Sequence, residues 1–166
     1  AQGLADTLTL KAMDPAYAAN TLLNSGGGDD TVNILATPAG AQTSLNLGAG
    51  VDTAVFGATL ATAGTGAGTL AGILGPITAP VAAAENIIID NSADTVNRVW
   101  TADSPGAGLG RVSVAGLAAA IAYNTAAPAN LVIHAGGGDD QLVVDFSGGN
   151  ASDPMPASGL TFNGRE

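Results

Sequence analysis

Apolar residues recur at every second position in several short segments of this chain. The pattern is clearest at Val32-Asn33-Ile34, Leu45-Asn46-Leu47, Val112-Ser113-Val114 and Leu131-Val132-Ile133. A period of two that is rich in β-branched residues predicts strands with one face turned inward and one turned outward. We therefore expect an all-β protein whose core is built from Leu, Ile and Val.

Glycine-rich turns separate these strands, and the unit of strand, turn and strand repeats. Residues 21–34 read TLLNSGGGDDTVNI, residues 44–57 read SLNLGAGVDTAVFG, residues 130–144 read NLVIHAGGGDDQLVV, and residues 86–99 form a degenerate copy. The first residues of the successive turns are Gly26, Gly48, Gly66, Asp90, Gly106 and Gly136, which gives a mean spacing of 22 residues. Such a period is typical of solenoids.

The repeat predicts an irregular parallel β-solenoid, similar to a β-helix or β-roll, with about 22 residues per coil. Residues 1–166 are expected to form a single domain, either a segment of a longer repetitive protein or a filament subunit. An antiparallel β-sandwich is the alternative, because short strands joined by glycine turns occur there as well.

Alanine-rich stretches at 58–84 and 115–129 are the main challenge to an all-β fold, since alanine has the highest helix propensity. Glycine or proline interrupts them at nearly every turn's length, and glycine in a helix costs about 1 kcal/mol relative to alanine. The alanine content leaves room for one short helix around 115–123. Elsewhere these stretches are expected to form narrow strands and long loops that leave a coil and rejoin it.

An aspartate ends several of the glycine-rich turns, at Asp30, Asp52, Asp94 and Asp140. The strings GGGDDTV, GAGVDTA and GGGDDQL resemble the haemolysin-type, or RTX, calcium repeat G-G-x-G-x-D-x-U-x. The resemblance implies an all-oxygen calcium site between neighbouring turns, formed by glycine carbonyls and aspartate carboxylates. The candidate ligands are Asp29, Asp30, Asp52, Asp139 and Asp140.

Electrostatics supplies a separate reason to consider a cation. Equivalent carboxylates of Asp30 and Asp52 in successive coils would lie roughly 5 Å apart. Two unit charges at that separation repel by about 0.8 kcal/mol in water and about 3 kcal/mol at an effective dielectric constant of 20. A bound divalent ion reverses the sign. The alternative is that the carboxylates accept hydrogen bonds from turn N–H groups and point into solvent.

The strings LNLGAGVDTAV and NSGGGDDTVNI also resemble repeat regions of giant secreted bacterial surface proteins. That resemblance implies an extracellular or cell-surface location and a stalk-like, often adhesive role. Solenoid ends expose unpaired backbone groups, and both ends of this sequence are strand-like, in DTLTL and GLTFNG, so the expected partners are neighbouring repeats or identical subunits placed end to end. A surface glycan or a protein is a further class of ligand.

Composition excludes several other classes of function. Four Lys and Arg residues stand against 14 Asp and Glu, giving a net charge of −10, which disfavours nucleic-acid binding. The chain has no cysteine, so disulfides, thiolate zinc sites and cysteine nucleophiles are ruled out. No apolar run approaches the roughly 18 to 20 residues of a membrane helix, so we expect no membrane insertion.

No catalytic constellation is visible in the sequence. His134 is the single histidine, a G-x-S-x-G motif is absent, and Lys11, Arg98, Arg111 and Arg165 are far apart. His134 is expected to be solvated or packed under a loop. We therefore expect a structural module rather than an enzyme. A carbohydrate-binding or polysaccharide-degrading β-helix domain is the alternative.

Overall fold

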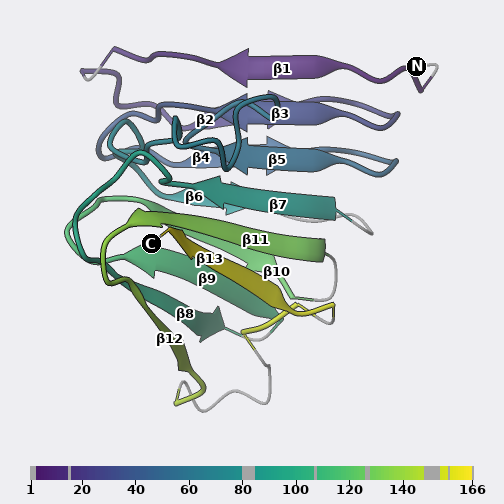
Figure 1. Cartoon of the computed structure of the whole chain (residues 1–166). Helices are drawn as coiled ribbons and strands as arrows, with labels where there is room; N and C mark the ends of the chain where they lie inside the picture. Colours follow the sequence, from purple (N-terminus) through teal and green to yellow (C-terminus); the bar gives the residue numbers. More distant parts are fainter. Residues whose placement is uncertain are drawn as a thin grey trace.

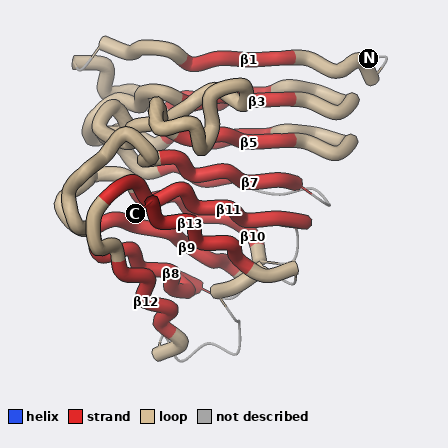
Figure 2. The backbone as a smooth tube through the Cα atoms, in the orientation of Figure 1, coloured by secondary structure: helices blue, strands red, loops and turns tan. Residues whose placement is uncertain are grey.

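The computed structural model describes residues 3–14, 16–79, 85–106, 108–125, 128–147, 154–156 and 158–165. Within these ranges the chain forms thirteen strands and no helix (Figure 2). The strands are β1 (Thr7–Leu10), β2 (Thr21–Asn24), β3 (Thr31–Ile34), β4 (Thr43–Asn46), β5 (Thr53–Phe56), β6 (Ile77–Ala79), β7 (Glu85–Asp90), β8 (Val99–Gly106), β9 (Leu109–Val114), β10 (Ala120–Asn124), β11 (Pro128–Gly137), β12 (Gln141–Asp145) and β13 (Leu160–Arg165).

The strands form two sheets that are mostly parallel (Figure 1). Sheet I has the order β1-β3-β5-β7-β11-β13, and all its pairings are parallel. Sheet II has the order β12-β8-β9-β10-β6-β4-β2, and only β9 runs antiparallel to its neighbours. From β1 to β7 the chain alternates strictly between the two sheets. The all-β prediction is confirmed, and the antiparallel sandwich is not the observed arrangement.

A spacing of 22 residues holds only near the N-terminus. Paired residues along sheet I are 24 and 22 positions apart from β1 to β5, and then 33, 44 and 29 apart. The longer steps contain residues 57–76, which follow β5, and the β8-β9-β10 meander. Gly66 and Gly106 belong to these insertions, so they do not mark the start of a repeat unit.

The short helix considered for residues 115–123 does not form. Residues 120–124 form β10, which pairs with β9 on one side and β6 on the other. Ile121 and Tyr123 are buried while the residues between and beside them are half-buried, which is the alternation of a strand. Side-chain packing on this face therefore outweighs the intrinsic helix propensity of alanine.

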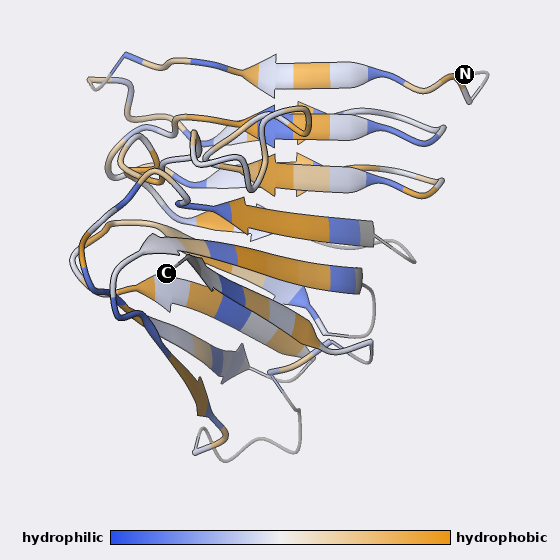
Figure 3. Cartoon of the chain, viewed as in Figure 1, coloured by the Kyte–Doolittle hydropathy of each residue, from blue (hydrophilic) through white to orange (hydrophobic). Residues whose placement is uncertain are grey.

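The core lies between the two sheets as columns of apolar side chains. In sheet I one column contains Ile34, Phe56, Ile89 and Ile133, each 0% exposed. Hydrophobic residues fill much of β5, β7 and β11 (Figure 3). Complete burial of one such side chain contributes about 1.5–3 kcal/mol, so the columns supply the main driving force for stacking.

Candidate functional site: the stacked acidic turns

The acidic residues selected from the sequence lie in two separate places. Asp29 and Asp30 precede β3, and Asp52 precedes β5, so the three residues lie at the N-terminal ends of neighbouring strands of sheet I. Asp139 and Asp140 precede β12 in sheet II, where the register sets Asp140 beside Arg98. The structure therefore does not bring the five residues into one cluster.

Asp6, Asp30 and Asp52 form a column that we call the acidic ladder. Each precedes the first residue of a strand, and those residues, Thr7, Thr31 and Thr53, are paired across β1, β3 and β5. The Asp30 N–H donates to Oδ1 of Asp52 at 2.8 Å, and the Asp6 N–H donates to Oδ1 of Asp30 at 2.8 Å. The carboxylates of Asp30 and Asp52 thus each tie their own turn to the turn of the preceding strand.

Asp29 braces the same turn in the opposite direction. Its Oδ1 accepts the Val51 N–H of the following turn at 2.9 Å. Adjacent residues Asp29 and Asp30 therefore hold the following and the preceding turn, respectively. The alternative drawn from the sequence, in which these carboxylates accept turn N–H groups, is confirmed. Its second part, that they point into solvent, is wrong for Asp30 and Asp52, which are only 1% exposed and accept N–H groups of the preceding turn.

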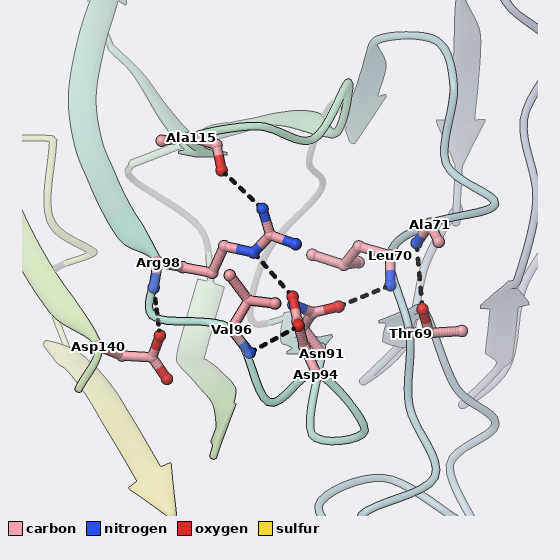
Figure 4. Close-up of polar contacts among 9 residues, drawn as sticks. All are labelled: Thr69, Leu70, Ala71, Asn91, Asp94, Val96, Arg98, Ala115 and Asp140. Atoms are coloured by element: carbon pink, nitrogen blue, oxygen red, sulfur yellow. Dashed lines mark hydrogen bonds and ion pairs between the residues drawn. The ribbon is translucent and has the colours of Figure 1, made fainter. Parts of the chain in front are cut away.

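The same device recurs in sheet II. The Arg98 N–H donates to Oδ1 of Asp140 at 2.8 Å (Figure 4), and the Asp139 N–H donates to Oδ1 of Asn97 at 3.0 Å. Asn97 and Asp140 thus take the parts that Asp29 and Asp52 take in sheet I. Two unrelated turn pairs with one bonding pattern show that the pattern belongs to the stacking of strands.

Asp94 differs from the other turn aspartates. Its Oδ1 accepts the Val96 N–H within its own turn, and its Oδ2 accepts from Arg98 Nε at 2.8 Å and from Asn91 Nδ2 at 2.9 Å (Figure 4). Burial opposes ionisation, but these donors outweigh it and set the pKa of Asp94 below its usual value. Asp94 is therefore an ion-pair partner inside one turn, although its spacing groups it with Asp30 and Asp52.

The polar run Asp90-Asn91-Ser92 anchors the long loop 57–76, a role that the turn spacing of Asp90 does not indicate. Asp90 is 0% exposed and accepts the Gly64 N–H at 2.8 Å and the Ser92 N–H at 2.8 Å. Asn91 and Ser92 accept further backbone N–H groups of this loop. The available signal was three consecutive polar residues directly after the apolar run of β7.

Backbone contact between successive turns requires glycine. The Gly28 N–H donates to the Ala49 carbonyl at 2.8 Å, and the Ala49 N–H donates to the Gly26 carbonyl at 3.3 Å. A Cβ on Gly48 would lie 1.4 Å from the Gly26 carbonyl oxygen. The turns therefore pack main chain on main chain, which leaves no room there for a side chain.

The arrangement does not fit a calcium cage. Calcium takes six to eight oxygen ligands. The carbonyls of Gly26 and Ala49 already accept hydrogen bonds from the adjoining turn, as does Oδ1 of Asp30 and Asp52. The second carboxylate oxygens of these two aspartates are buried without a hydrogen-bond partner, but no group of three or more His, Cys, Asp or Glu gathers in the described ranges.

Burial raises the pKa of the Asp52 carboxyl. The hydrogen bond from the Asp30 N–H lowers this pKa and the nearby charges of Asp30 and Asp29 raise it, so that the net shift is upward. Between the folded pKa and the ordinary value of 3.8, the folded protein binds more protons than the unfolded chain. The contribution of Asp52 to stability therefore becomes more favourable as pH falls through this window and is weakened above it.

We expect Asp52→Asn to remove this part of the pH dependence, because asparagine keeps an oxygen for the Asp30 N–H and carries no charge. Tm against pH, measured by circular dichroism, should be flatter for the variant, which should also gain relative to the parent near neutral pH. Asp14→Asn, at an exposed turn position, serves as the control. Equal slopes for Asp52→Asn and the parent would contradict the expectation.

A groove of about 480 Å³ lies on the outer face of sheet I beside the long loop. It is lined by Thr7, Thr9, Thr31, Asn33, Thr59, Leu60 and Ala61. Asn33 connects the two sides, because its Nδ2 donates to Thr9 Oγ1 at 3.1 Å and its Oδ1 accepts the Leu60 N–H at 2.9 Å. The lining contains no charged and no aromatic side chain.

His134 lies on the outer face of β11 under the same loop. It is half-buried, and a Cβ on Gly64 would come within 2.8 Å of its ring. Its ring Nδ1 is 3.5 Å from Asn163 Nδ2. The loop-packed position is one of the two that the sequence analysis expected.

No protein-family model, no curated protein and no solved structure matches this chain. Among the described residues, no helix is both long enough and apolar enough to cross a bilayer.

Proposed function

We propose that the chain is a structural β-solenoid module, a stalk, spacer or filament unit of an extracellular bacterial surface protein. The observation that carries this proposal is the in-register stacking of like residues. Thr7 pairs with Thr31 and Thr31 with Thr53, and each directly follows a residue of the acidic ladder. One coil of the solenoid consists of a strand from sheet I followed by a strand from sheet II. The resemblance to repeats of secreted surface proteins supports the location.

The hydrogen bonding within the acidic ladder suits a module that must be stiff along its stacking axis. Apolar columns, strand hydrogen bonds and carboxylate braces all connect a coil to its immediate neighbours, which is how repeat proteins obtain stiffness along one axis. The buried side chains of Asp30 and Asp52 are used as braces between turns, and each accepts a backbone N–H from the preceding turn. This use of charged groups supports a scaffold in preference to a catalytic cleft.

Surface labelling tests the proposal directly. Antibodies raised against the folded chain should bind intact cells of the source organism, and brief protease treatment of those cells should remove the signal. Negative-stain electron microscopy of the full-length product should show elongated particles. Antigen that is detected only after cell lysis, in compact particles, would overturn the assignment.

Calcium binding stays a prediction of the RTX resemblance, and a melting experiment separates it from the hydrogen-bonded arrangement. If calcium binds the folded state, millimolar calcium should raise the Tm of chelator-treated protein, since a ligand specific to the native state stabilises it by mass action. A rise in the parent that is lost in Asp30→Asn and Asp52→Asn would establish the site. Because the turn carbonyls and carboxylates are already hydrogen-bonded, we expect no rise in the parent.

A further inference from the structure

The N-terminal edge of sheet I is built like an internal strand but is uncovered. Leu8 of β1 is 36% exposed, whereas its partner Val32 and the next residue in the column, Ala54, are both 0% exposed. All three occupy the same inward register. Because none of the described strands lies beyond β1, the difference arises from the position of β1 at the end of the sheet and not from a change of pattern.

The acidic ladder also ends uncovered at β1, and its hydrogen bonds all run in one direction along the column. The carboxylates of Asp52 and Asp30 each accept the N–H of the equivalent residue one turn earlier, and both side chains are 1% exposed. Asp6 holds the next place in this column and is exposed. Its own N–H is already used by Asp30, so the position repeats the ladder and extends it to the edge of the sheet.

The backbone of β1 also shows which groups a neighbour would meet. At equivalent positions the Thr31 N–H donates to the Asp6 carbonyl and the Thr53 N–H to the Asp30 carbonyl, both at 2.8 Å. At the other end of the strands the Leu35 N–H donates to the Leu10 carbonyl. By the same register, the amides of Thr7 and Lys11 face a strand placed beyond β1.

We propose that this edge docks a further turn-and-strand segment of the chain's own pattern, running parallel to β1. The inference rests on the solenoid proposed above and names its partner. The segment must supply a backbone N–H for the Asp6 carboxylate, carbonyls for the amides of Thr7 and Lys11, and apolar side chains level with Leu8 and Leu10. Proline at the N–H position is excluded.

A second copy of the chain fits this edge less well. At the far end of the molecule sheet II carries the β8-β9-β10 meander, and Figure 1 shows β12 extending past β13, the last strand of sheet I. Within the described part of the chain, sheet I has six strands and sheet II has seven. A copy stacked head to tail would thus meet an uneven surface, in contrast to the regular parallel β3 that β1 meets within the chain.

The test is an extended chain in which residues 26–51 replace residues 1–5, so that the new junction from Val51 to Asp6 copies the natural step from Val51 to Asp52. We expect hydrogen exchange at the Thr7 and Lys11 amides to slow by about tenfold or more, and Tm to rise. The matched control deletes Val51 from the added segment. A one-residue slip turns its apolar residues outward and should abolish the protection.

Equal exchange at Thr7 and Lys11 in the extended chain and the parent would overturn the proposal. If the extended chain does not fold, a peptide of residues 26–36 titrated into the parent decides, and unchanged Thr7 and Lys11 amide signals at millimolar peptide reject the site. A concentration-dependent dimer of the parent with both amides protected would assign the edge to a second copy instead. Each result is independent of cell-surface labelling, so failure of the docking site is distinguishable from failure of the surface role.

Discussion

Replacing Gly48 by alanine is expected to lower the free energy of unfolding by about 2–5 kcal/mol. The φ angle of Gly48 is +89°, and L side chains pay about 1–2 kcal/mol in the left-handed region. The new Cβ would also lie 1.4 Å from the Gly26 carbonyl oxygen, so the two turns must separate, and overpacking of this kind costs about 1–3 kcal/mol more. Urea denaturation followed by circular dichroism measures the loss.

Gly26→Ala is the matched control. Gly26 also has a positive φ, of +108°, but a Cβ there meets nothing within 4 Å. It should cost only the conformational part, about 1–2 kcal/mol. Because both substitutions restrict the unfolded chain equally, the difference between them isolates the contact between stacked turns. Equal losses would show that turn stacking contributes nothing beyond backbone conformation.

The strands were predictable because their signal is local. Val32 and Ile34 alternate with Asn33 in the sequence, and both apolar residues are 0% exposed in the structure. Asn33 shows where that signal ends. It points to the outer face, as the alternation requires, yet it is only 3% exposed, because Leu60 of the long loop packs over it and donates its N–H. The alternation of apolar and polar residues does not reveal that a loop distant in the sequence will bury an outward-facing residue.

The acidic turns were recognised, but their bonding depends on which turns become neighbours. Sequence spacing placed Asp94 with Asp30 and Asp52, whereas Asp94 bonds within its own turn and to Arg98. The turn at the end of β11 does stack against the Asp94 turn, but it does so through the main chain, because the Gly137 N–H donates to the Asp94 carbonyl at 2.8 Å. Local motif similarity cannot report this, because neighbours are set by chain topology.

The insertions explain why the mean spacing of 22 residues does not extend along the whole of sheet I. Residues 57–76 have glycines at spacings like those of the turns, but Asp90, Asn91 and Ser92 hold this loop against the outer face of sheet I. A Cβ on Gly68 would come within 2.1 Å of the Asp90 side chain, so glycine serves close packing there and not a turn between strands. The same residue type thus has two physical roles that composition does not separate.

Phe56→Ala is expected to cost about 3–5 kcal/mol of folding free energy, the usual loss for a fully buried phenylalanine. Phe56 is 0% exposed and lies in register between Ile34 of β3 and Ile89 of β7. Removing its ring leaves a cavity in the middle of the apolar column. Urea unfolding can be followed through the fluorescence of Trp100, the single tryptophan, which is itself buried.

Phe146→Ala provides the control for residue type, because Phe146 is 64% exposed and its loss should change stability by no more than about 0.5 kcal/mol. The location of the damage is as informative as its size. In a stack where each coil contacts only its neighbours, hydrogen exchange in Phe56→Ala should accelerate most in β3, β5 and β7 and least in β13. Uniform acceleration through both sheets would instead indicate one globular cooperative unit, and equal losses for Phe56→Ala and Phe146→Ala would remove the apolar column as the source of stability.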